Sequence, residues 1–196
     1  MKIGILGGTF DPPHLGHLEF ARSALEILHL DEVIFLPAHR NPLKKFASSP
    51  AKQRLEMVER MIQKEPKMAV SDIEISRGGP SYMVETLMEL QIVRPGDYWL
   101  LLGADALKSF EEWKNPGKIV KLARLGVAVR PPTTETDVRA RLTAEMRERV
   151  DIVSMKPVDV SATELRIRLA KRSGIVAPFL SPGVLQYIKQ NHLYGS

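Results

Sequence analysis

Short apolar runs alternate along the chain with longer segments whose apolar residues recur at helical spacing. The runs are nearly continuous in Val, Ile and Leu, which is typical of strands buried on both faces of a parallel sheet. This pattern predicts strands over residues 3–6, 32–36, 68–75, 98–102, 125–129 and 151–155. It predicts helices over residues 17–28, 52–63, 81–91 and 137–149, and two short helices from residue 161 onward. The helix over 137–149 is expected to be exposed and held by the pairs Asp137–Arg141 and Glu145–Arg149.

Alternation of strands and helices indicates a parallel sheet with helices on both faces. We therefore expect an α/β fold: a Rossmann-like three-layer α/β/α sandwich with a mainly parallel sheet and a small C-terminal helical part. No shift in composition marks a linker, so we expect one domain over residues 1–196, with a core over 1–155 and a helical segment over 156–196 packed on it. Because ligands of such sheets bind beyond the carboxyl ends of the strands, the loop after the first strand is the expected place for chemistry.

Composition narrows the class of protein. Hydrophobic residues make up 44% of the 196 residues and charged residues 26%, as in an ordinary globular domain. The absence of cysteine excludes disulfides, thiolate metal sites and a cysteine nucleophile, and it fits a cytoplasmic location. No signal peptide or membrane span is visible, so we expect no membrane partner. The net charge of +5 favours anionic small molecules or plain solubility over nucleic acid, because the basic residues are spread out.

The loop after the first strand carries the strongest chemical signal. Residues 7–17 read G-G-T-F-D-P-P-H-L-G-H, in which two glycines let the backbone approach a ligand and a helix is expected to start near His14. His14 and His17 are three residues apart, so both can lie on one helix face and donate hydrogen bonds to phosphate oxygens. Metal ligation and a purely structural role remain alternatives. Neither the G-x-G-x-x-G spacing of dinucleotide-binding folds nor a Walker phosphate loop is present.

The same stretch resembles the signature of the cytidylyltransferase-like superfamily, and the chain is similar to the bacterial nicotinate-nucleotide adenylyltransferases. Residues 160–166, V-S-A-T-E-L-R, resemble the second motif of the superfamily, residues 102–105, L-G-A-D, resemble its I-G-[AQ]-D, and Arg130-Pro131 resembles its R-P. As local structure alone, Ser161 and Asp105 would be helix caps. The resemblance implies an ATP site made of Gly7, Gly8, Thr9, Phe10, His14, His17, Gly103, Asp105, Arg130, Ser161, Thr163 and Arg166.

Two further features resemble the acceptor side of the family. Residues 79–83, G-P-S-Y-M, resemble its G-P-S-Y-T with methionine in place of threonine. Trp113 stands where the family has a tryptophan, and an indole can stack on a pyridine ring, although a core position is an alternative for it. The resemblance implies a nicotinate mononucleotide site made of Thr9, Lys44, Ser81, Tyr82, Met83 and Trp113.

Residues 37–44 resemble a family loop that usually ends P-P-H-K. Lys44 is retained, but Leu43 stands where a histidine is expected near the substrate phosphates. His39 and Arg40 are candidates to compensate for that loss.

The resemblance implies transfer of AMP from ATP to nicotinate mononucleotide, giving nicotinate adenine dinucleotide and pyrophosphate in NAD biosynthesis. The implied catalytic residues are His14, His17, Lys44 and Arg166. Mg²⁺ is the implied cofactor, held mainly by phosphate oxygens and by no protein ligand. Alternatives are a sister adenylyltransferase acting on nicotinamide mononucleotide or another phosphate acceptor, a cytidylyltransferase, a class I aminoacyl-tRNA synthetase fragment and a nucleic-acid-binding protein. Assembly into a homo-oligomer stays open.

Overall fold

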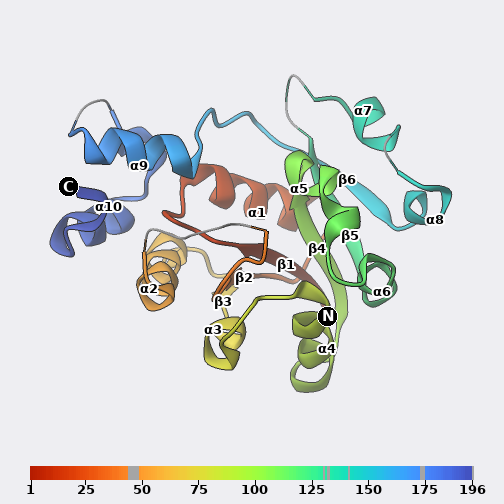
Figure 1. The fold of residues 1–196 in the computed structure, drawn as a ribbon. Coiled ribbons are helices and arrows are strands. Elements are labelled where there is room, and N and C mark those ends of the chain that lie inside the picture. The colour runs from red at the N-terminus through yellow and green to blue at the C-terminus, as the bar shows by residue number, and fades with distance from the viewer. Residues whose placement is uncertain (44–48, 130, 132, 141, 173–174, 196) are drawn as a thin grey trace. The chain divides into compact units, whose positions relative to one another are not determined.

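The computed structural model describes residues 1–43, 49–129, 131, 133–140, 142–172 and 175–195. Its strands form one sheet in the order β3-β2-β1-β4-β5-β6 (Figure 1). The neighbouring pairs β1–β4, β4–β5 and β5–β6 are parallel. This order reverses direction beside β1, as in doubly wound nucleotide-binding sheets, so the predicted Rossmann-like α/β fold is confirmed. The strands are β1 (Lys2–Gly8), β2 (Glu32–Pro37), β3 (Met68–Val70), β4 (Asp97–Gly103), β5 (Ala123–Val129) and β6 (Val150–Ser154).

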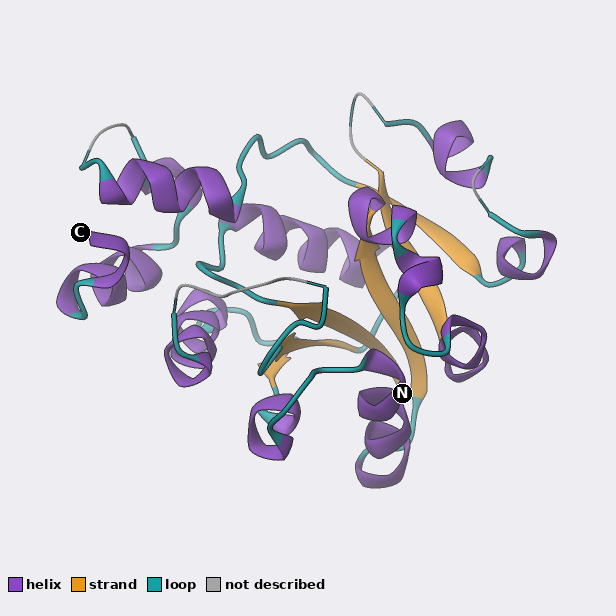
Figure 2. Cartoon of the chain, in the orientation of Figure 1, coloured by secondary structure: helices purple, strands orange, loops and turns teal. Residues whose placement is uncertain are grey.

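Helices connect the strands and follow the last of them (Figure 2). The α-helices are α1 (Leu15–Ile27), α2 (Ala51–Ile62), α3 (Ile73–Arg77), α4 (Met83–Val93), α5 (Ala104–Lys108), α6 (Pro116–Leu122), α7 (Glu135–Arg139), α8 (Ala144–Arg147), α9 (Ala162–Ala170) and α10 (Pro182–Gln190). Short 3₁₀ turns are η1 (Phe110–Glu112), η2 (Ala177–Phe179) and η3 (Leu193–Gly195). The pair α9 and α10 confirms the predicted short C-terminal helices. None of the described helices has both the length and the apolar character needed to cross a membrane.

The described chain forms two compact units. The first unit comprises Met1–Gly7, Phe20–Ile34 and Tyr82–Pro157. The second unit comprises Gly8–Glu19, Phe35–Ser81 and Val158–Ser196. The single domain expected from the sequence stays a prediction.

The core of the first unit explains why its strands read as continuous apolar runs. Leu100, Leu101 and Leu102 on β4 are all at least 97% buried, although successive side chains point to opposite faces. On β5, a Cβ added at Gly126 would lie 2.7 Å from the side chain of Leu101. The glycine therefore lets the neighbouring leucine pack directly onto the strand, and both faces of this part of the sheet are dry.

Two sequence predictions are wrong. The strand predicted over 68–75 ends at Val70, and α3 occupies the last part of that run. The reason is local, because the Ser76 hydroxyl donates to the carboxylate of Asp72 at 2.7 Å, and Asp72 is the N-cap of α3.

The helix predicted over 137–149 is two short helices, α7 and α8, which lie beside β6 in the first unit (Figure 1). Each helix starts at its own threonine cap: Thr134 accepts from the Asp137 N–H at 3.2 Å and Thr143 from the Met146 N–H at 3.3 Å. A capping threonine inside the predicted span thus starts a new helix. Asp137 completes a capping box with Thr134, while Arg141 and the Glu145 side chain lie outside the described residues.

Candidate functional site

The two histidines of the first loop lie together in the second unit, as their spacing predicts. Their rings are stacked with centroids 3.7 Å apart and planes 28° from parallel. His17 Nδ1 accepts the backbone N–H of His14 at 3.2 Å, so Nε2 is the donor of the neutral His17 ring. A Cβ on Gly16 would lie 3.0 Å from His14 Nδ1, and glycine therefore leaves room for the stacked pair. The H-x-G-H spacing is thus a geometric requirement of this arrangement.

Phe10 holds a strained backbone conformation just before the histidines. Its φ is +52°, in the left-handed region that bulky side chains rarely adopt. The ring is 2% exposed and packs against His17 and Phe35, with centroids 5.0 and 5.6 Å away. The preceding hydroxyl, Thr9 Oγ1, is buried with no hydrogen-bond partner among the described residues. Backbone strain and an unsatisfied hydroxyl in one loop are features of binding sites.

The second motif meets this loop within the second unit. Arg166 donates to the backbone carbonyl of Asp11 at 2.7 Å and to the hydroxyl of Thr163 at 3.3 Å. Ser161 caps α9 by accepting the Glu164 N–H at 3.1 Å, so its capping role is real. The structure therefore brings the predicted residues 161, 163 and 166 together with the first loop.

The turn at residues 79–81 is hydrogen-bonded to the segment after β2, also in the second unit. The His39 N–H donates to Ser81 Oγ at 2.9 Å, and the Ser81 N–H donates to the Arg40 carbonyl at 2.9 Å. His39 Nδ1 lies 2.9 Å from the Gly79 carbonyl. His39 thus supports the acceptor turn, whereas Leu43 is exposed. The predicted residues Lys44 and Arg130 lie outside the described residues.

The remaining acceptor residues lie in the first unit. Met83 begins α4, and its Cε would lie 2.7 Å from a Cβ placed on Gly7, so the methionine side chain covers that glycine. Trp113 packs against Phe110 with ring centroids 5.4 Å apart, and its buried Nε1–H has no partner among the described residues. Trp113 is half-buried, so the core interpretation and the stacking interpretation of the tryptophan both stay open.

A lysine that the sequence did not single out stands beside the acceptor residues of the first unit. Lys114 Nζ lies 4.3 Å from the centroid of the Tyr82 ring and 2.6 Å from Glu85 Oε1. The hydrogen bond to Glu85 raises the pKa of Lys114, so it is a cation at neutral pH. Lys114 follows Trp113 directly. A basic residue next to a tryptophan that could stack on a ligand ring was the feature of the sequence that could have identified it.

Gly103 and Asp105 lie where β4 passes into α5 in the first unit. Gly103, not Asp105, is the N-cap of α5, so the N-cap interpretation of the aspartate is wrong. Asp105 is exposed and pairs with Lys108 at 2.7 Å. The role predicted for Asp105 in binding a ribose hydroxyl stays a prediction.

The sequence matches a known family over most of its length. The profile of the cytidylyltransferase-like family matches residues 5–168. The chain belongs to this family. The probable nicotinate-nucleotide adenylyltransferase of Herpetosiphon aurantiacus is 39% identical over 98% of this chain and 98% of its own. That of Exiguobacterium sibiricum is 38% identical over the whole of both chains. The resemblance stated from the motifs is confirmed.

Solved structures agree on the fold. The nicotinic acid mononucleotide adenylyltransferase of Plasmodium falciparum, complexed with NaAD, has a TM-score of 0.82 at 18% identity and covers 99% of this chain and 97% of that chain. At this identity the likeness shows the fold of the family alone, and it includes the whole described sheet.

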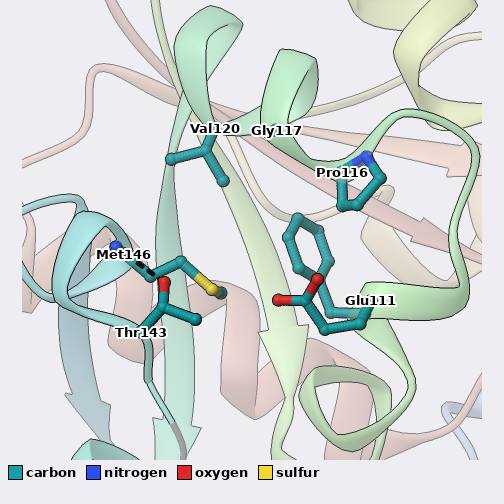
Figure 3. Close-up of a pocket in the computed structure, with 7 residues that line it drawn as sticks. Glu111, Pro116, Gly117, Val120, Thr143 and Met146 are labelled. Atoms are coloured by element: carbon teal, nitrogen blue, oxygen red, sulfur yellow. Dashed lines mark hydrogen bonds between the residues drawn. The ribbon is translucent and has the colours of Figure 1, made fainter.

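A cavity in the first unit contains none of the predicted residues. It has a volume of about 140 Å³ and is closed on one side by the capped turn of Thr143 and Met146 (Figure 3). The other residues that line it are Phe110, Glu111, Pro116, Gly117 and Val120. The described residues also contain no group of three or more His, Cys, Asp or Glu side chains that could hold a metal ion.

Sequence reasoning missed Arg54, a buried residue of α2 in the second unit. In the helix predicted over 52–63, Arg54 precedes the apolar residues Val58 and Met61 by four and seven positions, which is the spacing of one helix face. All three are at least 96% buried. An arginine in the apolar stripe of a helix was therefore the signal, because charged residues are almost never fully buried without polar partners.

Proposed function

We propose that the chain transfers the AMP part of ATP to nicotinate mononucleotide and releases pyrophosphate. The observation that carries this proposal is the second unit, in which the stacked histidines and Arg166 are assembled around one loop. Such an arrangement supplies hydrogen-bond donors and positive charge for phosphate oxygens. The similarity to relatives named nicotinate-nucleotide adenylyltransferases over nearly the whole chain supports the same reaction.

The reaction is one displacement at phosphorus. A phosphate oxygen of the acceptor attacks the α-phosphorus of ATP, the new P–O bond forms, and the bond to the β-phosphate oxygen breaks, so pyrophosphate leaves with the bonding electrons. No covalent enzyme intermediate is needed, because catalysis comes from positioning and charge stabilisation. His17 donates from Nε2 to the triphosphate and His14 supports the stacked geometry. Arg166 and Lys44 hold the charge of the leaving pyrophosphate.

The other predicted ATP residues divide into two roles under this proposal. The backbone of the first loop approaches the phosphates at Gly7, Gly8, Thr9 and Phe10, with Ser161 and Thr163 contributing from the second motif. Gly103, Asp105 and Arg130 hold the adenosine part, with the exposed Asp105 carboxylate accepting from a ribose hydroxyl.

We propose that Mg²⁺ accompanies ATP. The described residues provide no cage of carboxylates or imidazoles, which fits a cation that binds mainly to phosphate oxygens and keeps several waters. When bound, the ion neutralises charge on the phosphates and makes pyrophosphate a better leaving group. We also place the reaction in the cytoplasm.

The acid form of the acceptor is preferred because of how α4 begins. Its N-cap residue, Tyr82, makes no side-chain capping hydrogen bond, so no side-chain cap competes with a ligand for the positive end of this 11-residue helix. A carboxylate only accepts hydrogen bonds, whereas the NH₂ of nicotinamide needs acceptors of its own. Trp113 stacks on the pyridine ring, and Ser81 and Met83 complete the acceptor side.

The test is pyrophosphate release from ATP and Mg²⁺ with nicotinate mononucleotide, with nicotinamide mononucleotide and with no acceptor. We expect release only with an acceptor, and a kcat/KM for the acid form higher by about 10³–10⁴, because a site of N–H donors discriminates strongly against an amide. Trapping of an adenylyl-enzyme without acceptor would contradict the mechanism. An equal or higher kcat/KM for the amide would assign the chain to the sister adenylyltransferases.

A further inference from the structure

Arg54 joins three separate backbone segments of the second unit. Its side chain is 1% exposed and donates to four backbone carbonyls. Nη1 donates to Thr9 at 2.7 Å, and Nη2 donates to Ala38 at 2.6 Å and to His39 at 3.1 Å. Nε donates to Ser49 at 3.1 Å. One guanidinium therefore ties the loop after β1 to the loop after β2 and to Ser49, two residues before α2.

The burial of this cation is costly for folding. Desolvation lowers the pKa of Arg54, and the nearby Asp11 and Tyr194 oppose that shift. Well-packed apolar residues often replace buried charges with no loss of stability. A planar fork of five N–H donors, however, is the one side chain that can hold several carbonyls of two loops at once. The arrangement therefore favours a role in fixing loop geometry over a role in stability alone.

The carbonyl bonds determine where the following amides point. In a trans peptide group the C=O and the next N–H point in opposite directions. Because Arg54 holds the Thr9 carbonyl, the Phe10 N–H points away from the guanidinium. The Phe10 backbone is in a strained conformation, with φ at +52°, which persists only if its surroundings hold it. The bond to Thr9 is one of these restraints, and the packing of the Phe10 ring is another.

The same argument applies to the loop after β2. Arg54 holds the Ala38 carbonyl, and the next amide, His39 N–H, donates outward to Ser81 Oγ at 2.9 Å. It also holds the His39 carbonyl, so the Arg40 N–H points away from the guanidinium. The loop after β1 and the loop after β2 are thus both restrained by a single side chain.

We infer that Arg54 is a positioning residue of the transfer reaction, which turns the Phe10 N–H toward the phosphate oxygens of bound substrate. This inference rests on the proposed adenylyl transfer. Arg54 touches no substrate itself; it acts through the peptide group Thr9–Phe10, while its bonds to Ala38 and His39 hold the loop after β2, whose Arg40 forms a parallel bridge with Pro80.

The inference is tested by measuring the kinetics of Arg54→Lys and Arg54→Met, with Arg60→Met as the control variant. Arg60 lies on the same helix, and its guanidinium is 4.9 Å from the centroid of the Tyr187 ring, outside the candidate site. At a temperature where all variants are folded, we expect kcat per folded molecule to fall about 10²-fold in Arg54→Met, because small misplacement of reacting groups has effects of this size. Arg54→Lys is expected to fall less, and Arg60→Met to keep the wild-type kcat.

A merely structural arginine would lower the melting temperature and leave kcat per folded molecule within about threefold of wild type, which would overturn the inference. Chemical rescue adds a second readout. Millimolar guanidinium ion is expected to raise kcat of Arg54→Ala, while the same concentration of methylammonium, which lacks the planar fork, is not. Equal rescue by both ions would contradict the need for a bifurcated donor.

A binding measurement separates this inference from the proposed reaction. In ¹⁵N-labelled wild-type protein, ATP is expected to shift the Phe10 amide resonance, and Arg54→Lys is expected to reduce that shift. If the wild type shows no turnover with nicotinate mononucleotide, the proposed function fails while the amide shift still tests the role of Arg54. Absence of the shift in wild type saturated with ATP overturns the inference even if no Arg54 variant folds.

Discussion

The two units hold their candidate ligand-binding residues in opposite ways. In the second unit the supporting groups are buried: Asp11 is 3% exposed and accepts a hydrogen bond from the Tyr194 hydroxyl at 2.6 Å, and Arg54 is 1% exposed. In the first unit the comparable pair, Lys114 and Glu85, has side chains 46% and 41% exposed. The supporting groups of the second unit are held by buried polar contacts, and the Lys114–Glu85 pair of the first unit is exposed to solvent.

This difference has an energetic consequence. Removing a partner from a buried polar group leaves that group unsatisfied, which costs about 1–3 kcal/mol, whereas an exposed ion pair contributes little. The geometry of the loop after β1 is therefore linked to the stability of its unit. The exposed Lys114–Glu85 pair is not, so a substitution there is expected to leave the fold intact.

The largest expected effect is in the second unit, at the half-buried His17. His17→Ala removes the Nε2 donor, and we expect kcat to fall about 10²–10³-fold, because loss of one transition-state donor has this effect. His29→Asn is the matched control, since His29 is exposed and its positive φ of 51° suits asparagine. A folded His17→Ala variant with kcat within about threefold of wild type would remove this histidine from the mechanism.

Tyr194→Phe tests the contact between the Tyr194 hydroxyl and the buried Asp11 in the second unit. Burial and the bond to Asp11 raise the pKa of the Tyr194 phenol, so it is a neutral donor at all working pH values. We expect the free energy of unfolding in urea to fall by about 1–3 kcal/mol, because the buried Asp11 carboxylate loses this donor. Tyr187→Phe, which removes another phenol hydroxyl bonded to a carboxylate, that of Glu56, is the matched control. A Tyr194→Phe variant as stable as wild type would refute the buried-contact argument.

Asp151 in the first unit is intermediate in exposure between the buried groups of the second unit and the exposed Lys114–Glu85 pair. Burial opposes its ionisation, but hydrogen bonds from Arg124 and Trp99 outweigh this effect and lower its pKa below the ordinary 3.8. A depressed carboxylate pKa gives stability that is complete above the unfolded pKa and is lost as the pH falls through the folded one. Its side chain is 30% exposed, so we expect about 1 kcal/mol.

The measurement is urea unfolding of wild type and Asp151→Asn at pH 7 and at pH 3. We expect the wild type to be more stable at pH 7 and the difference to shrink at pH 3. The exposed Asp159→Asn is the control. A difference that grows on acidification would show that the sign of the argument is wrong.

The sequence predicted the structural features that depend on residues close together along the chain. His14 and His17 stack because they are three positions apart with a glycine between them, and Ser161 caps α9 three residues before the amide that it binds. The buried strands followed from continuous apolar runs. Where two local signals competed, the prediction was wrong: the start of α3 after Asp72 ended one strand early, and Thr143 divided a predicted helix.

The contacts that support the site could not be predicted, because they join distant residues. Arg54 meets Thr9 across 45 positions, and Tyr194 meets Asp11 across 183. No local spacing encodes either pair. An arginine in the stripe of α2 and a terminal tyrosine could be recognised as unusual, but the carbonyls and the carboxylate that they bind appear only once the chain is folded.

The smallest effect is expected in the exposed set, from Lys114→Met. Lys114 Nζ lies over the Tyr82 ring and pairs with Glu85 beside solvent, so its removal is expected to leave the midpoint of thermal unfolding unchanged within error. Its charge attracts the carboxylate of the acceptor, so KM for nicotinate mononucleotide should rise by no more than about fivefold, with kcat retained. KM for nicotinamide mononucleotide should stay constant, because the amide is neutral. Lys118→Met, also exposed, controls for the loss of one surface charge. An increase shared by both acceptors, or a clear drop in melting temperature, would place Lys114 among the structural contacts and remove the contrast between the two units.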